Sequence, residues 1–68
     1  MSSRLTMPTE DELAELSHAE LHECIRVAFH QWRAAFRTGE DIAECRQIFN
    51  AYDNEQLKRL KRVKKYLR

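Results

Sequence analysis

The chain has 68 residues, of which 43% are hydrophobic and 34% charged, and its formal net charge is +1. This length predicts a single domain with a small core, for which a second copy of the chain is the simplest stabilising partner. A net charge near zero gives no reason to expect a nucleic acid or a membrane as partner. The chain has no apolar run near the ~20 residues that a membrane span needs, and its first residues lack the apolar centre of a signal peptide, so we expect a cytoplasmic protein.

A short acidic helix is predicted after an N-terminal arm. The arm, residues 1–8, ends at the chain's one proline and is expected to be flexible. Thr9 and Glu12 fit a capping box, in which the hydroxyl accepts a hydrogen bond from the backbone and the carboxylate reaches back to the cap. This pattern predicts a helix from about Glu10 to Leu16.

The first long helix is predicted to run from His18 to Arg37. Ser17 and Glu20 fit a second capping box, which favours a fresh helix start over a single unbroken helix from residue 10. Apolar residues then recur on one helical face, at Leu21, Cys24, Ile25, Ala28, Phe29, Trp32, Ala35 and Phe36. This face is broader than one neighbouring helix covers, which predicts further association.

A second long helix is predicted from Ile42 to about Tyr66. Gly39 supplies the left-handed residue that commonly ends a helix, and Asp41 with Glu44 fits a third capping box. The apolar positions of this helix keep one phase throughout, at Ile42, Cys45, Phe49, Tyr52, Gln56, Leu60, Val63 and Leu67. A connection this short makes two helices antiparallel, so we predict an all-α domain, residues 9–68, built as a helical hairpin.

The aromatic residues gather toward the predicted turn, and they include Phe29, Trp32, Phe36 and Phe49. Aromatic residues at helical spacing normally form a core. Two facing helices leave one side of such a group open to water, so we predict that these residues form the core of a homodimer. The dimer is expected to be a four-helix bundle made from two hairpins.

A cationic stripe without an acid lies on the opposite face of the first long helix. Its members fall within a band of roughly 80°, and they are His22, Arg26, His30, Arg33 and Arg37. An ordinary solvated face is one interpretation. The alternative is a docking surface for a target protein, in which Arg26, Arg33 and Arg37 make the contact. Tyr52, expected near the open edge of the helix pair, is added to this site because tyrosine is enriched in interface hot spots.

The charges are unevenly distributed along the chain. Residues 1–57 hold all eleven acids and five of the Lys and Arg residues, while residues 58–68 hold seven Lys and Arg and no acid. In an antiparallel hairpin, the acidic residues 10–15 can fold back beside this basic tail and neutralise part of it. The functional alternative is phosphate binding, because clustered cations on a helix release counterions from nucleic acid. Its candidate residues are Lys58, Lys61, Arg62 and Lys65.

Neither a metal site nor a catalytic site is predicted. His18 and His22 could hold a metal ion from one helix face, but the sequence suggests no third ligand. The glutamate between them does not directly follow the first histidine, as the zinc-peptidase pattern requires. Cys24 and Cys45 fall on apolar faces without a base or an oxyanion site nearby. We therefore expect reduced core thiols, no cofactor and no enzymatic activity.

By size and layout, the chain resembles the compact helical proteins that bacteriophages and plasmids encode to bind and disable or retune a host protein, such as anti-quorum-sensing and polymerase-binding proteins. In outline it is also similar to the plasmid RNA-binding hairpin dimer and to the small hairpin chaperones of type III secretion, but its basic C-terminus departs from both. The first resemblance implies a small regulatory protein that binds and inhibits or modulates another protein, for example a transcription regulator. A small dimeric protein that binds DNA or RNA through the basic helix is the alternative.

Overall fold

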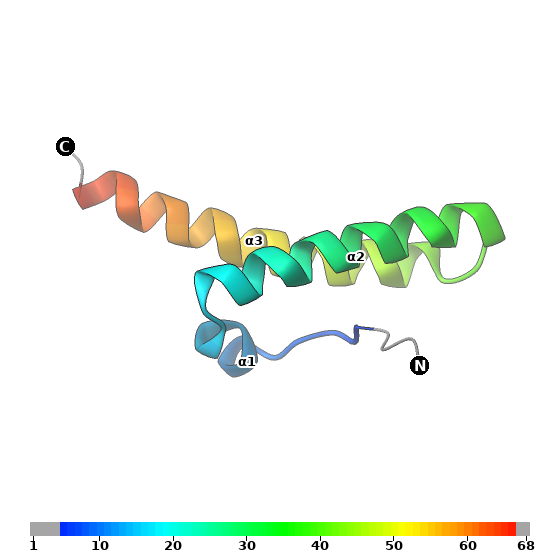
Figure 1. Cartoon of the computed structure of the whole chain (residues 1–68), viewed down its shortest axis with the longest axis horizontal. Coiled ribbons are helices and arrows are strands. Elements are labelled where there is room, and N and C mark those ends of the chain that lie inside the picture. The colour runs from blue at the N-terminus through cyan, green and yellow to red at the C-terminus, as the bar shows by residue number, and fades with distance from the viewer. Residues whose placement is uncertain (1–4, 67–68) are drawn as a thin grey trace.

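The computed structural model describes residues 5–66, and for residues 63–66 it describes the backbone alone. Within this range the secondary structure is helical, with α1 from Glu10 to Glu15, α2 from His18 to Thr38 and α3 from Ile42 to Tyr66 (Figure 1). The predicted all-α class is confirmed. The helix boundaries lie within one residue of those that the sequence predicts.

Both N-terminal capping boxes are formed. The Thr9 hydroxyl accepts a hydrogen bond from the Glu12 amide at 3.1 Å, and the Glu12 carboxylate accepts one from the Thr9 amide at 2.9 Å. Ser17 and Glu20 make the same pair of contacts at 3.0 and 2.9 Å. Between the two boxes Leu16 is extended, with ψ of 136°, so α1 and α2 are separate helices and the unbroken helix is excluded.

The turn between α2 and α3 contains two left-handed residues. Gly39 has φ of 75° and ψ of 9°, and its amide donates to the Ala35 carbonyl at 2.7 Å, which closes the end of α2. Asp41 has φ of 56°, whereas a residue that opens a capping box normally has extended backbone. Aspartate tolerates the left-handed region better than most side chains, and this lets the chain reverse within so short a turn.

α2 and α3 lie side by side along most of their length, and α3 continues past the start of α2 (Figure 1). α1 and the arm lie together on another side of this helix pair. The molecule is elongated, with extents of 45 × 21 × 17 Å. The two long helices therefore have some faces that are covered by the N-terminal segment and others that are open.

The main core lies between the long helices and the N-terminal segment. It is formed by Leu21 and Ala28 of α2 with Ile48 and Tyr52 of α3. Half-buried side chains pack against it from every described segment, and they are Leu5, Leu13, Leu16, Cys24, Ile25 and Phe49. The arm thus contributes at least one side chain, Leu5, to the packing of the domain.

Tyr52 belongs to this core, which corrects the expectation that it lies near an open edge. Its residue is only 7% exposed. It follows Ile48 by one helical turn, so both side chains face the same packed side of α3. Burial raises the pKa of its phenol, and the charges of Cys24 and Glu12 add to that rise. Tyr52 therefore does not offer its ring to a target protein.

We expect Gly39→Ala to lower the free energy of unfolding by about 1 kcal/mol, because the Cβ of alanine is strained in left-handed backbone. A Cβ added at Gly39 would meet nothing within 4 Å, so the whole effect comes from the backbone angle. Gly39→Asn should cost less, since asparagine enters this region more readily. Urea denaturation followed by circular dichroism measures both, and equal midpoints for G39A and the parent would contradict this account of the turn.

Candidate functional site

An aromatic cluster lies where α2 passes α3 near the turn. Phe29 and Trp32 of α2 pack against Phe49 of α3, with ring centroids 5.8 and 5.6 Å away. Phe36 stacks on Trp32 at 5.7 Å. These distances are typical of favourable aromatic pairs, so the four rings form one continuous unit across both helices.

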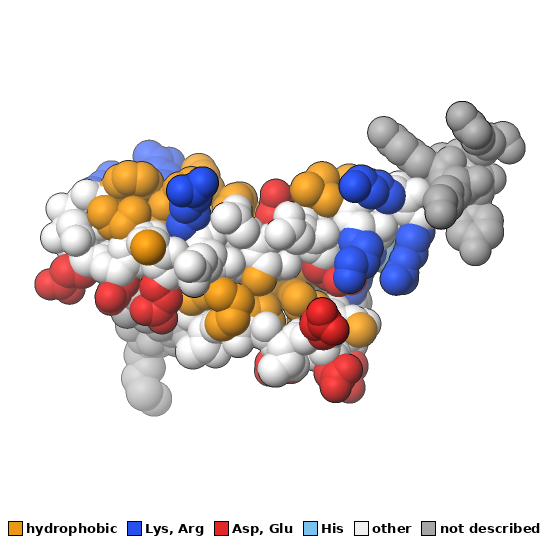
Figure 2. Space-filling model, turned by 180° about the vertical axis from the view of Figure 1, so that it is seen from behind, with side chains coloured by type: hydrophobic (Ala, Val, Ile, Leu, Met, Phe, Trp, Pro, Cys, Tyr) orange, Lys and Arg blue, Asp and Glu red, His pale blue; other side chains and the backbone are white. Residues whose placement is uncertain are grey.

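Much of this aromatic cluster is open to solvent. Phe36 is 61% exposed and Phe29 is 41% exposed, although both are large apolar side chains. The Nε1 atom of Trp32 is buried and has no hydrogen-bond partner among the described residues. Figure 2 shows hydrophobic side chains gathered over the half of the molecule that contains the turn. An open apolar group of this kind is typical of a protein-binding surface.

Further apolar side chains extend this open surface along α3. Leu57 and Leu60 are 48% and 52% exposed. Leu60 follows Phe49 by eleven residues, which is close to three full turns, so both lie on one face of the helix. Figure 2 shows a second hydrophobic group beside basic side chains on the C-terminal half of α3. The open apolar face of the helix pair is thus longer than the aromatic cluster alone.

The cationic stripe borders the aromatic cluster. The guanidinium carbon of Arg33 lies 5.9 Å from the centroid of the Phe29 ring, within the range of a cation–π contact. Arg37 is exposed in the last turn of α2, where a positive charge is favoured by the helix dipole. The other members, His22, Arg26 and His30, are also exposed. The structure therefore joins an apolar group and a cationic group that the sequence presents as two separate faces.

Arg26 differs from Arg33 and Arg37 because it is paired with an acid, Glu23, which is not a member of the stripe. The two side chains form an ion pair with a separation of 2.7 Å, at an exposed position. The hydrogen bond and the charge of Arg26 lower the pKa of the Glu23 carboxyl, and Glu23 in turn raises the pKa of Arg26. Arg33 and Arg37 are thus the better candidates for contact with a target.

The basic end of α3 faces the acidic helix across a groove. Glu10 and Asp11 of α1 line one wall of this groove, and Lys58 and Arg62 of α3 line the other. Both basic residues are exposed, as is Lys61. The side chain of Lys65, the remaining candidate for phosphate binding, lies outside the described residues. Acid and base therefore lie near each other here, in the arrangement that the charge distribution suggests.

The sequence analysis missed the role of Arg59, which joins α1 to α3. Its Nη2 atom donates to the carbonyl oxygens of Leu13 and Leu16 at 2.8 and 2.9 Å. These carbonyls lie at the C-terminal end of α1, where the helix dipole is negative. The Leu13 carbonyl also accepts from the Leu16 amide at 3.3 Å. Arg59 thus acts as a cap supplied from another helix.

Two further contacts hold the guanidinium of Arg59 in place. Its Nε atom donates to Glu55 at 2.8 Å, and these side chains are only 14% and 12% exposed. Its Nη1 atom lies 3.2 Å from Nδ1 of His18. Arginine has no acceptor atom, so His18 must accept this bond with an unprotonated Nδ1. The i,i+4 spacing of Glu55 and Arg59 was the one local signal of this site, whereas its other contacts depend on the tertiary fold.

The two thiols lie in unreactive surroundings. Cys24 is half-buried, and burial raises the pKa of its thiol, with Glu20 and Glu23 adding to the effect. A raised pKa leaves less of the nucleophilic thiolate at neutral pH. Cys45 is buried beside the turn. Among the described residues, no group of three His, Cys, Asp or Glu side chains could hold a metal ion.

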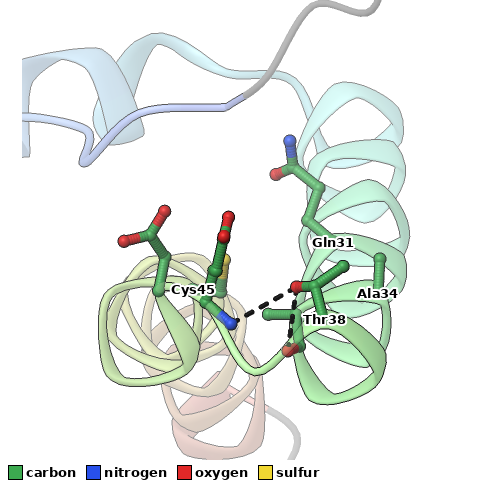
Figure 3. Close-up of a pocket in the computed structure, with 7 residues that line it drawn as sticks. Gln31, Ala34, Thr38 and Cys45 are labelled. Carbon is green, nitrogen blue, oxygen red and sulfur yellow. Dashed lines mark hydrogen bonds between the residues drawn. The ribbon is translucent and has the colours of Figure 1, made fainter.

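A pocket beside the turn is lined by side chains of α2 and α3, among them Gln31, Ala34, Thr38 and Cys45 (Figure 3). The Thr38 hydroxyl donates to the Ala35 carbonyl and accepts from the Glu40 amide, both at 3.3 Å. These bonds secure the end of α2. The hydroxyl of Thr38 in this pocket is therefore used by the turn.

Comparison with protein families, with curated proteins and with solved structures found no match to this chain. Within residues 5–66, no helix has the length and apolar character needed to cross a membrane. The case for a function therefore depends on the surfaces described above.

We expect Arg59→Lys to release α1 while α2 and α3 stay folded, because a lysine ammonium cannot contact the two carbonyls, Glu55 and His18 at once as the planar guanidinium does. Hydrogen bonds to a charged group are worth roughly 1.5 kcal/mol or more, so the amides of α1 should exchange about tenfold faster. Hydrogen exchange read by NMR measures this, and Arg62→Lys, about one turn further along α3 at an exposed position, is the matched control. Unchanged exchange in R59K would show that apolar contacts alone hold α1.

Proposed function

We propose that this chain is a small non-enzymatic regulatory protein that binds another protein and inhibits or modulates it, and that it works as a homodimer. The observation that carries this proposal is the open aromatic cluster with Arg33 against its edge. Exposed aromatic groups bordered by arginine have the composition of interface hot spots. A catalytic role has no comparable support from the described side chains.

The proposed dimer is a four-helix bundle in which each copy contributes α2 and α3 as an antiparallel hairpin. The open faces of the two copies would meet through the aromatic cluster, Phe29, Trp32, Phe36 and Phe49. Full burial of one such apolar side chain is worth about 1.5 to 3 kcal/mol, and symmetry doubles each contribution. The elongated shape of the helix pair suits this kind of association, since long helices align well in bundles.

The dimer is tested by a charge placed in the aromatic cluster. Phe36→Glu should give a folded monomer, because a carboxylate in an apolar interface carries a large desolvation cost and Phe36 contributes little to the core of one copy. Sedimentation equilibrium at tens of micromolar measures the mass of each variant. Ala34→Glu, on an exposed position of the same helix, is the matched control and should remain dimeric. A monomeric parent would contradict the dimer.

The target is proposed to contact the cationic stripe rather than the basic tail. Arg33 is restrained by Phe29, and both Arg33 and Arg37 stand on a helix that is packed along its length. Side chains that are already ordered lose less entropy on binding. Arginine also pairs with carboxylates through two parallel hydrogen bonds, so an acidic surface of a protein is the expected target.

Two double variants, each replacing two cations by glutamate, distinguish target binding by the stripe from target binding by the tail. Combining Arg33→Glu with Arg37→Glu should weaken target binding at least about tenfold, or roughly 1.4 kcal/mol, while Lys58→Glu with Lys61→Glu should change it much less. The measurement is affinity capture from a cell lysate with quantification of each captured protein. A specific target is retained by the parent and the tail variant and is lost by the stripe variant. Loss with the tail variant alone would contradict the proposal.

A small dimeric protein that binds DNA or RNA through α3 is the alternative, and the exposure of Lys58, Lys61 and Arg62 favours it. Binding driven by phosphates must weaken steeply as salt rises. A gel-shift assay with duplex DNA and with RNA at two salt concentrations distinguishes the two functions. Salt-sensitive retention of nucleic acid that K58E/K61E abolishes would establish the alternative.

A further inference from the structure

The helix pair has a second apolar face, and the N-terminal segment of the chain covers it. Leu13 of α1, Leu16 directly after it and Leu5 of the arm pack against the core formed by α2 and α3. None of the α1 residues is itself buried. The core side of this contact, by contrast, contains Ile48 and Tyr52, which are 2% and 7% exposed. The long helices thus provide an apolar site, and α1 lies on its surface.

The contacts of α1 are those of a short peptide bound in a groove. Leucines three residues apart provide its apolar side. Arg59 binds the carbonyls at its C-terminal end, at 2.8 and 2.9 Å. The acids of its first turn, Glu10 and Asp11, face basic residues of α3 across the groove. Each of these contacts is made to α3 or to the core, and Arg59 is also held by Glu55 and His18.

α1 can also detach from the helix pair without disturbing the start of α2. An isolated helix of six residues is well below the length that is stable in water. The extended residue Leu16 separates it from α2. The cap of α2 is made by Ser17 and Glu20 and requires nothing from α1. Local opening of this segment should therefore cost much less than global unfolding.

From these contacts we infer that α1 is a built-in occupant of a peptide-binding site, and that the site accepts a short acidic helix of a partner protein in its place. The partner helix has two leucines three residues apart, acids in its first turn, and a C-terminal end that meets Arg59. This inference rests on the proposed function in that the partner is a protein, but the site is separate from the aromatic cluster and from the cationic stripe. Binding of such a helix would release α1 and the arm.

The probe for this site is a fluorescent synthetic peptide with the sequence of residues 5–17, added to the full chain. The chain variant combines Leu13→Glu with Leu16→Glu, which weakens the internal helix and leaves Arg59, Ile48 and Tyr52 unchanged. Fluorescence anisotropy should show the peptide binding this variant about tenfold more tightly than the parent, because an internal occupant raises the apparent dissociation constant by the inverse of the open fraction. Adding Arg59→Lys to the variant should abolish the gain.

Two matched controls define the specificity. A peptide in which both leucines are replaced by serine should not bind either chain. A chain with Ala19→Glu and Ala43→Glu, two exposed positions outside this groove, should bind the peptide no better than the parent does. If the L13E/L16E variant keeps the helicity of α2 and α3 yet binds the peptide no better than the parent, the inference is wrong.

Hydrogen exchange on the unmodified chain gives a second and independent measurement, which holds even if L13E/L16E fails to fold. The Leu13 and Leu16 amides donate within this segment, at 3.0 and 3.3 Å, and should exchange well before those in the middle of α2. Equal protection of both would overturn the inference, since α1 would then open only when the whole domain unfolds. Failure of the proposed function would instead appear in the sedimentation and capture experiments, which do not depend on α1.

Discussion

Two helices joined by a short turn cannot enclose the apolar face that α2 presents. That face includes Leu21 and Ala28, which meet α3, and also Phe29 and Phe36, which α3 leaves largely open. The face of a helix that contacts one neighbour is narrower than this, so part of the apolar surface must be covered by something else or remain in water. In this chain, α1 and the arm cover one side of the helix pair, and the other side remains open. The division of the molecule into a packed side and an open side follows from this.

Arg59 determines how α1 is oriented on the packed side of the helix pair. Apolar contacts from Leu13 and Leu16 can hold a short helix against a core, but they do not fix its direction or its end. The guanidinium of Arg59 does both, because its Nη2 atom donates to two carbonyls at one end of α1 while Glu55 holds its Nε atom. The charge is compensated by a carboxylate and by backbone dipoles, so its low exposure does not leave an isolated buried ion.

The sequence predicted the local features of this fold well, since each depends on residues within one or two helical turns. The capping boxes at Thr9 and Ser17, the left-handed Gly39 and the continuous third helix all have signals of that range. It failed at Tyr52, because the helical phase alone does not say which edge of an apolar stripe the N-terminal segment will cover. It also missed most contacts of Arg59, whose partners His18, Leu16 and Leu13 are 41, 43 and 46 residues away. The aromatic cluster was predicted as a group, whereas its contact with Arg33 depends on a side-chain position.

The open side offers two kinds of interaction that respond differently to solution conditions, and this bears on how one small surface could serve both the proposed second copy and the proposed target. Burial of Phe29 and Phe36 is driven by the hydrophobic effect, which salts such as sulfate strengthen. Pairing of the arginines with an acidic surface is screened over about 10 Å at 0.1 M salt. Arg33 takes part in both, because it lies over Phe29 and is also a member of the stripe. Covering the ring on its other side with a second copy would leave the guanidinium at the rim of the interface, where it is ordered by the aromatic cluster and still open to a carboxylate of the target. The two associations are therefore compatible in physical terms, and dimer formation would favour target binding by restraining the side chain that makes the contact.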